Sequence, residues 1–326
     1  MTDKTLVTPG IEHSVPWFWP LAAVMEMQKE GLKVFQDNLK YVAVSAKIVA
    51  PPQPDWATPN KVRIDLDTMR LRDFAGAAAG LPRVLVTDWK SATKAMRDYD
   101  IDKYLADLDA AVDAAGGRVH LVGLCQGGWM SAMYACLHPD KVCSLVLAGS
   151  PIDTNAGNGP IRKIAHEMPL SFYQEMVDAG GGLMRGQFML AGWKNMHPDQ
   201  QYVGKFVDLY EHIEDKCYIK RTEQFERWYE NPIDLPGRYY LQCIELLFEE
   251  NRFARGEFVA HGKTLSLKHI TCPVYLLAGA GDDITTSEQV FAAEALIATE
   301  ASKVRKQLAP GGHIGLFMGS GTLQDV

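Results

Sequence analysis

Residues Arg118–Trp129 read RVHLVGLCQGGW, and this stretch decides the fold. The largely apolar run 119–123 predicts a buried strand, and residues 130–136 suit a helix. Between them lies Cys125, with Gly123 two positions before it and Gly127 two positions after it. A strand, a glycine, a nucleophile, a second glycine and a helix form the pattern of a nucleophile elbow.

The elbow is a turn so sharp that it strains the backbone of the nucleophile. We expect Gly123 and Gly127 to remove side chains that would clash there. The turn raises the sulfur of Cys125 over the sheet at a helix N-terminus, where the peptide dipoles favour the thiolate. A buried structural cysteine at a strand end is the alternative, because cysteine is often buried. The rest of the chain decides between the two.

Two further side chains follow predicted strands near the end of the chain. Asp282 comes after the apolar run 273–277, and His313 comes after the run 304–308. The carboxyl ends of strands are where open α/β sheets place their chemistry. The order Cys125, Asp282, His313 is the nucleophile, acid, histidine order of α/β-hydrolases, so we predict that these residues form a catalytic triad.

Asp282 is the predicted acid, although Asp283 adjoins it. Asp282 directly follows Gly281 and stands two positions before Ile284, which can anchor the loop in the core. Asp283 would then point elsewhere and cap the helix near Thr285 and Thr286.

Composition excludes several classes of function. The net charge of −7 over 326 residues gives no general attraction for nucleic acid or an anionic membrane. The start MTDKTLVTPG lacks a signal layout, and no long uncharged apolar run predicts a membrane span. The six cysteines include no CxxC pair, which favours free thiols in a reducing cytoplasm. We expect no cofactor and no metal site.

Strands alternate with helices through most of the chain. This order predicts an α/β fold with a mostly parallel sheet covered by helices on both faces. Besides the segments above, the prediction rests on strands at 61–72, 84–86 and 142–147 and on helices at 101–112 and 288–298, the first of them ending at Gly116.

The region from Pro151 to about Lys268 is different in character. Aromatic and charged residues interleave at helical spacing, so we predict a helical cap inserted at about 154–261. The cap carries aromatic side chains that suit either a substrate channel or packing between helices: Trp193, Trp228, Tyr229, Tyr239 and Tyr240. The run Gly180–Gly182 predicts a helix end, since it lacks the strand and the Lys-Ser/Thr pair of a phosphate loop.

The first 60 residues form a predicted helical arm with a proline-rich linker, and residues 61–326 form the α/β domain with its cap. Apolar residues recur in the arm at alternating steps of four and three, with Gln28 as the polar exception: Leu21, Met25, Leu32, Phe35, Leu39 and Val42. We expect this seam to pack on the protein's own core. A dimer interface and docking on a hydrophobic particle are the alternatives.

Several motifs resemble one family of enzymes. GLCQGGW resembles the cysteine elbow of polyhydroxyalkanoate synthases, and YYLQCIELLFEENRFARGEF and GDDIT are similar to their C-terminal half. GGHIGLFMGS looks more like intracellular polyhydroxyalkanoate depolymerases, which also use a cysteine, and TDWKSAT and IDKYLADL are similar to both. The resemblance covers roughly residues 62–319. It implies that Cys125 is the nucleophile, His313 the base and Asp282 the acid.

One departure from that family concerns the oxyanion hole. These proteins carry a strand, a loop and a helix before the TDWK motif, and the connection 74–82 is too short for that unit. The strand at 84–86 would then either pair directly with the elbow strand or take the place of the missing strand. In the second arrangement, amides near Asp88 and Trp89 could donate to the oxyanion.

The motifs together predict a cysteine-dependent hydrolase of 3-hydroxyalkanoate polyester that works through an acyl-enzyme thioester, with the Gln126 amide holding the oxyanion. A synthase-type acyltransferase that uses 3-hydroxyacyl-CoA is the first alternative. A weakly active or non-catalytic protein of storage granules is the second. The expected partners are the polyester or thioester substrate, a granule surface and a second copy of the chain.

Overall fold

The computed structural model describes residues 19–74 and 83–319, with side chains from Gln28 onward. The described residues divide into two compact units, one formed by residues 19–54 with Trp193–Asn231 and the other by residues 55–74, 83–192 and 232–319. The proposed boundaries at residue 60 and at about 154–261 remain a prediction. Within the described ranges, no helix combines the length and the hydropathy that a membrane span requires.

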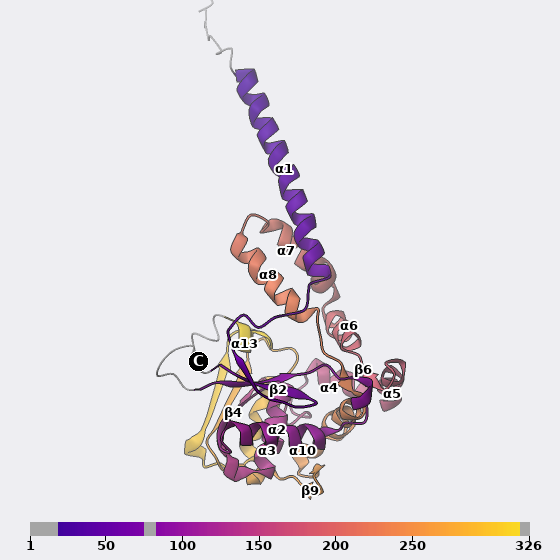
Figure 1. Cartoon of the computed structure of the whole chain (residues 1–326), viewed down its shortest axis with the longest axis vertical. Coiled ribbons are helices and arrows are strands. Elements are labelled where there is room, and N and C mark those ends of the chain that lie inside the picture. The colour runs from indigo at the N-terminus through magenta and orange to yellow at the C-terminus, as the bar shows by residue number, and fades with distance from the viewer. Residues whose placement is uncertain (1–18, 75–82, 320–326) are drawn as a thin grey trace, which may run out of the picture. The chain divides into compact units, whose positions relative to one another are not determined.

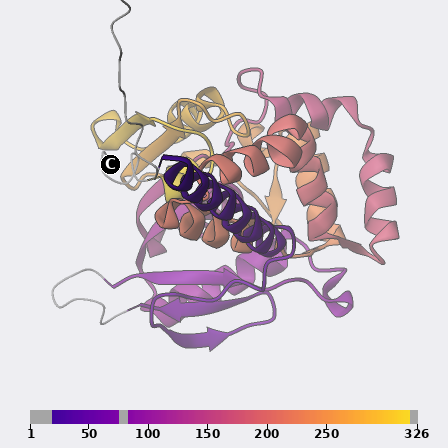
Figure 2. The ribbon, with the colours of Figure 1, turned by 90° about the horizontal axis from the view of Figure 1, so that it is seen from above.

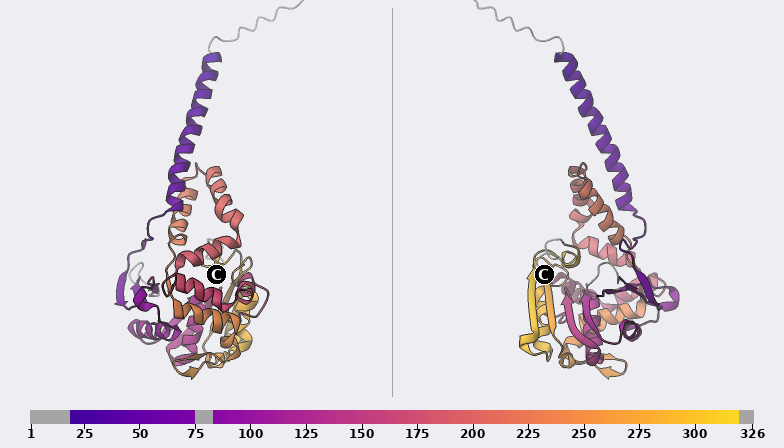
Figure 3. Two further views of the ribbon diagram at one scale, coloured as in Figure 1. Left: turned by 90° about the vertical axis from the view of Figure 1, so that its right-hand side faces the viewer. Right: turned by 60° about the vertical axis from the view of Figure 1, so that its left-hand side comes forward.

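A four-stranded parallel sheet organises the larger unit. Its order is β11-β10-β5-β4, and Figure 3 shows these strands side by side, from yellow to magenta. The strands are β4 (Val119–Leu124), β5 (Val142–Ala148), β10 (Val274–Gly279) and β11 (Val304–Ala309). All four lie within a residue or two of their predicted positions, because continuous apolar runs mark buried parallel strands.

A second, antiparallel sheet holds β1 (Lys61–Asp65), β2 (Met69–Asp73) and β3 (Leu85–Trp89). Figure 2 shows its purple strands apart from the yellow and orange strands of the parallel sheet. The prediction of one strand over 61–72 is wrong. A turn closed by the Leu66 amide, which donates to the Met69 carbonyl at 2.8 Å, divides the stretch into a hairpin.

Neither predicted placement of the strand at 84–86 is found. It belongs to β3, which pairs with β2 along its whole length, with Met69 opposite Trp89 and Asp73 opposite Leu85. In the described part of the chain no strand pairs with the outer edge of β4. The connection 75–82 lies outside the described residues.

Helices cover one face of the parallel sheet and build the main core. Leu145 and Leu147 of β5 and Leu276 of β10 are buried there against the helices that precede and follow β4. The main helices of this unit are α2 (Ile101–Ala115), α3 (Gln126–Leu137), α4 (Pro160–Glu167), α5 (Leu170–Ala179), α9 (Gly237–Gln242), η4 (Cys243–Glu249), α10 (Arg252–Arg255), α11 (Ser287–Phe291), α12 (Ala293–Leu296) and α13 (Gly315–Met318). The predicted helix at 288–298 is thus two short helices, and Gly180 does end α5.

The opposite face of the sheet is only partly covered. Near the carboxyl ends of the strands, Leu316 of α13 packs on Ala148, Leu277 and Ala309. Further from these ends, Val122 of β4 is 61% exposed. The short elements are η1 (Lys94–Met96), η2 (Pro139–Lys141), β6 (Leu183–Met184), β7 (Leu235–Pro236), β8 (Val259–Ala260), β9 (Lys263–Thr264), η5 (Leu267–His269) and η6 (Ala301–Lys303), and α6 (Gly186–Met196) passes from this unit into the other.

The smaller unit consists of α1 (Trp19–Val49), the end of α6, η3 (Gln200–Gly204), α7 (Lys205–Glu211) and α8 (Lys216–Tyr229). Figure 1 shows α1 as one long helix whose C-terminal turns lie beside α7 and α8. Val44 and Ile48 of α1 are buried there against Leu209, Ile213 and Ile219. This apolar cluster holds the three helices together.

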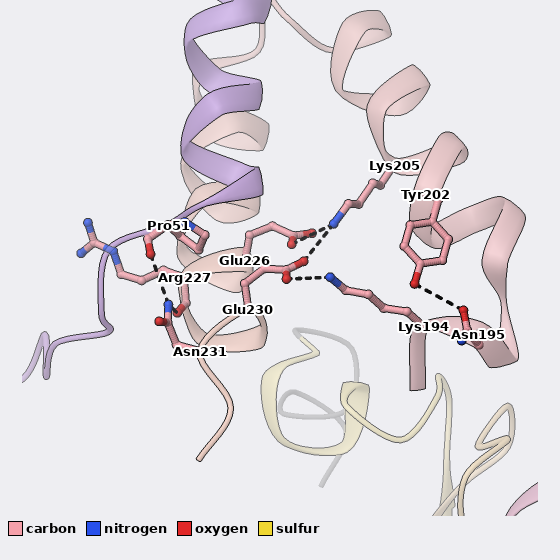
Figure 4. A network of polar contacts seen from close by, with 9 residues as sticks. All are labelled: Pro51, Lys194, Asn195, Tyr202, Lys205, Glu226, Arg227, Glu230 and Asn231. Atoms are coloured by element: carbon pink, nitrogen blue, oxygen red, sulfur yellow. Dashed lines mark hydrogen bonds and ion pairs between the residues drawn. The ribbon is translucent and has the colours of Figure 1, made fainter. Parts of the chain in front are cut away.

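A nearly buried set of ion pairs connects α6, α7 and α8 (Figure 4). Lys194 pairs with Glu230 at 2.6 Å, and Lys205 pairs with Glu226 at 3.1 Å and with Glu230 at 3.3 Å. Burial raises the pKa of Glu226, and this effect outweighs the opposing influence of Lys205. Lysine and glutamate are rarely buried unless they are paired, so this network accounts for the charges inside the unit.

The seam of the arm does not pack on the protein's own core, so that prediction is wrong. The described seam residues Leu32, Phe35, Leu39 and Val42 are all exposed. The side chains of Leu21 and Met25 lie outside the described residues. Helix α1 instead buries a different face, which includes Val44 and Ile48.

Candidate active site

Cys125 stands at the turn between β4 and α3. Its backbone has φ 50° and ψ −118°, a conformation that a residue with a side chain rarely adopts. Its amide donates to the Ala148 carbonyl at the end of β5 at 2.8 Å, which holds the turn against the sheet. The side chain is half-buried. Such local strain is the geometry expected of a nucleophile elbow.

Only one of the two predicted elbow glycines is required by sterics. A Cβ at Gly123 would lie 2.5 Å from the Gly127 carbonyl oxygen and 2.5 Å from the Gly128 Cα, too close for any side chain. A Cβ at Gly127 would meet no atom within 4 Å, so the expected clash there is wrong. The second tight position is Gly128, whose Cβ would lie 2.4 Å from Oγ of the buried Ser150.

The structure brings the predicted acid and base together. Nδ1 of His313 lies 2.8 Å from Oδ2 of Asp282, and both side chains are almost fully buried. Because a carboxylate only accepts, Nδ1 carries the proton and donates to Asp282. The Cys125 side chain is near enough to the imidazole to raise the pKa of His313. The structure thus joins Asp282 and His313 by a hydrogen bond, while the catalytic roles of these two residues and of Cys125 remain a prediction.

The other oxygen of Asp282 fixes the carboxylate in place. Oδ1 accepts from the Ile284 amide at 3.0 Å and from the Thr285 amide at 2.9 Å. Asp283 is exposed, and the residue at the N-cap of α11 is Thr286, so the predicted capping role of Asp283 is wrong. Asp282 performs both the anchoring of the loop and the contact with His313.

Neighbouring loops position the imidazole. The Gly281 amide donates to the Gly311 carbonyl at 2.9 Å, which joins the acid loop to the histidine loop. Gly149 has φ 53°, and a Cβ there would lie 3.2 Å from His313 Cε1 and 2.9 Å from Leu316. Gly149 was not predicted from the sequence, although a glycine directly after the strand beside the elbow is a usable signal.

The electrostatics of the site favour a charged imidazole. Burial lowers the pKa of His313, but the hydrogen bonds and charges of Asp282 and Cys125 outweigh burial and raise the pKa to about 10. His313 is therefore protonated at neutral pH. An imidazolium beside Cys125 stabilises negative charge on the sulfur, which is the nucleophilic form.

Gln126 begins α3, so its amide has no partner within that helix, and its role as an oxyanion donor remains a prediction. Its side-chain Nε2 donates to the phenol oxygen of Tyr239, which donates in turn to Met130 Sδ at 3.3 Å. Burial raises the pKa of Tyr239 well above its usual value, so this phenol stays neutral. Tyr239 is buried in the core, where its ring centroid lies 4.4 Å from that of Tyr104. Of the two roles predicted for the aromatic residues of the cap, a substrate channel or packing, Tyr239 has the packing role.

Comparison with known proteins places the chain in a family. A family profile described as "Protein of unknown function (DUF3141)" matches residues 98–323. The chain belongs to this family. The matched range includes Cys125, Asp282 and His313, and it leaves α1 and the antiparallel sheet outside.

Several curated relatives of this chain are polymerases by name. "Poly(3-hydroxyalkanoate) polymerase subunit PhaC" of Haloferax mediterranei is 28% identical over 73% of the chain and 49% of the relative. The protein of the same name from Allochromatium vinosum is 29% identical over 74% of the chain and 68% of the relative. The chain thus spans about half of the first relative's length. These likenesses support the polymerase alternative and give no support to the depolymerase reading of the motifs.

Solved structures establish the fold class. A mutant of an epoxide hydrolase from Bacillus megaterium aligns with a TM-score of 0.50 at 13% identity, covering 80% of this chain and 96% of the other. At that identity the likeness concerns the fold alone. The predicted α/β-hydrolase fold is confirmed.

Proposed function

We propose that this chain is a cysteine acyltransferase of the poly(3-hydroxyalkanoate) polymerase type, which takes the acyl group of a 3-hydroxyacyl thioester in the cytoplasm. The observation that carries the proposal is the buried hydrogen bond between His313 and Asp282, together with the strained elbow that presents Cys125. The likeness to polymerase subunits supports the choice of substrate class.

Each residue then has a defined role. The Cys125 thiolate attacks the thioester carbonyl, and the Gln126 amide donates to the oxyanion. As the carbon–sulfur bond to coenzyme A breaks, the leaving sulfur takes the proton from His313. The hydroxyl of a second hydroxyacyl group then attacks the enzyme thioester while His313 accepts its proton. The bond between the acyl carbon and Cys125 Sγ breaks, which forms the new ester and restores the Cys125 thiolate. Asp282 holds the imidazole in one tautomer throughout.

A cysteine suits transfer between thioesters. Sulfur exchanges for sulfur in the first step, so the acyl-enzyme is close in energy to the substrate. A hydrolase of polyester would use the same thioester, with water instead of a hydroxyl as acceptor. The relatives' names favour the hydroxyl acceptor.

The test is an incubation with 3-hydroxybutyryl-CoA in which coenzyme A, free acid and polymer are measured separately. We expect coenzyme A and polymer from the wild type and no turnover from Cys125→Ala. Cys217→Ala, which removes an exposed thiol far along the sequence, is the matched control and should retain full activity. Coenzyme A with free acid alone would contradict the acyltransferase and support a thioesterase. Full activity in Cys125→Ala would overturn the assigned nucleophile.

A further inference from the structure

Helix α1 carries two apolar faces, and only one of them has a partner in the described chain. At about 100° per residue, the exposed Phe35 and the buried Val44 lie about 180° apart around the helix axis. Val44 and Ile48 pack on α7 and α8. A stripe of apolar side chains on the opposite side meets solvent, and a contiguous stripe of that kind marks an interaction surface.

The stripe has a strict seven-residue repeat. Leu32 and Leu39 occupy one position of the repeat, called a, and Phe35, Val42 and Val49 occupy the position three residues later, called d. All five are exposed large apolar residues. Leu21 and Met25 continue the same spacing in the sequence. We call the stripe formed by Leu32, Phe35, Leu39, Val42 and Val49 the a/d seam.

The period of the repeat points to a helical partner. A straight helix has 3.6 residues per turn, so a stripe of period 3.5 drifts around it by about 20° per heptad. Only a second helix that supercoils with it stays in contact with such a stripe over its length. A helix that lies on a flat hydrophobic surface would instead carry a broad apolar face whose residues recur with a period of 3.6.

The residues beside the a/d seam also argue against docking of this face on a membrane or a particle surface. Helices that lie on such surfaces carry lysine and arginine along the border of the apolar face. Here the bordering positions hold one cation, and the rest are small or uncharged: Lys29, Gln36, Ala43, Gly31, Asn38 and Ser45. This border lets an identical helix approach without repulsion between like charges.

We propose that the chain self-associates through the a/d seam of α1, forming a parallel coiled coil with a second copy of itself. Gln28 fixes the direction. It occupies a d position and is exposed in the single chain. In a parallel pair it faces the partner's identical amide and can hydrogen-bond with it. In an antiparallel pair it would face an apolar layer and lose its partner on burial.

Sedimentation of the full chain across a range of concentrations tests the association. We expect the wild type to self-associate and Leu39→Glu to raise the dissociation constant by about 100-fold or more, since the seam would bury an unpaired carboxylate. Val34→Glu is the matched control: Val34 is 54% exposed and lies off the seam, whereas Leu39 is 56% exposed and lies on it. The control should associate like the wild type. Circular dichroism should show unchanged helix content in both.

Disulfide cross-linking tests the direction without relying on a disruptive variant. Gln28→Cys should form a covalent dimer under mild oxidation, because equivalent residues meet in a parallel pair, while Val34→Cys should not exceed the wild-type background. A wild type that stays monomeric would overturn the proposal. So would equal effects of Leu39→Glu and Val34→Glu. A monomeric wild type that binds hydroxybutyrate polymer particles through Leu39 would assign the seam to a particle surface instead.

Discussion

At the scale of single residues, His313 carries the chemistry of the site. It is buried, yet its pKa is raised, because the hydrogen bonds and charges of Asp282 and Cys125 outweigh the effect of burial. Burial alone would lower the pKa of the imidazole and favour its neutral form. The site therefore holds a protonated imidazole that can donate its proton to a leaving thiolate. This property fits acyl transfer from a thioester.

Titration of His313 by NMR should show this charge directly. The pKa of about 10 in the folded chain lies above the usual 6.5. The interaction therefore stabilises the fold fully below pH 6.5, and its contribution falls as the pH rises towards 10. Asp282→Asn removes a hydrogen bond and a charge that both raise the pKa, so it should shift the His313 pKa downwards. We expect it also to lower turnover by roughly 10⁴-fold, as in the serine triad.

Asp283→Asn is the matched control for that variant. It makes the same chemical change one residue away, on an exposed side chain. It should leave the His313 titration and the turnover close to those of the wild type. A larger loss from Asp283→Asn than from Asp282→Asn would reverse the assignment of the acid.

The sequence was sufficient to predict residues that lie at strand ends and insufficient for those that act through contacts between loops. Cys125, Asp282 and His313 each follow an apolar run, so the parallel sheet brings them to one edge. Gly128 and Gly149 matter because Ser150 and His313 lie against them, and these contacts join separate loops. Spacing within one motif carries no information about such neighbours, so it predicts a clash at Gly127 when the steric constraint falls on Gly128.

At the scale of elements, the packing of α3 against the end of β5 sets the elbow. Gly128→Ala would place a methyl group 2.4 Å from Ser150 and should push α3, and with it Cys125, away from the sheet. We expect a drop in melting temperature and a large loss of acylation, since overpacking typically costs about 1–3 kcal/mol. Gly127→Ala meets open space and should be tolerated. Equal tolerance of both variants, measured by thermal unfolding and by labelling of Cys125, would contradict this account.

Helix α1 shows that a sequence pattern predicts which residues share a face and does not predict the partner of that face. The seven-residue repeat of α1 predicted an apolar seam correctly, and exposure of Leu32 and Phe35 contradicts only the partner assigned to it. Periodicity reports which side chains share a face and not what covers that face. The second apolar face, with Tyr41, Val44 and Ile48, has the same spacing over a shorter stretch and was not predicted.

At the scale of the whole molecule, the parallel sheet of the larger unit has an open side. β4 is an edge strand in the described chain, and its Val122 is exposed, although strands of parallel sheets are normally covered on both faces. In an α/β-hydrolase, a loop after the neighbouring strand supplies one oxyanion donor. In this chain β3, the nearest preceding strand, pairs with β2 instead.

The open side predicts a selective weakness in catalysis. Among the described residues, the Gln126 amide is the donor that the elbow itself provides for the oxyanion. Loss of a second donor costs about 3 kcal/mol, or on the order of a hundredfold or more in rate. An activated nitrophenyl ester has a good leaving group and needs less stabilisation of its oxyanion, so it should still acylate Cys125 readily. 3-Hydroxybutyryl-CoA should react at least about a hundredfold more slowly than with the assembled polymerase of Allochromatium vinosum measured alongside.

The comparison of the two substrates separates a missing donor from a misplaced triad. A missing donor slows the unactivated thioester far more than the nitrophenyl ester, whereas a misplaced Cys125 or His313 slows both. Cys125→Ala supplies the baseline, and burst kinetics with the nitrophenyl ester count the competent sites. If the chain matched the polymerase on 3-hydroxybutyryl-CoA, another segment would have to supply the donor, and the open edge of β4 would be irrelevant to the chemistry. If both substrates were inert in folded protein, the triad geometry would support no acyl transfer, and the non-catalytic alternative would stand.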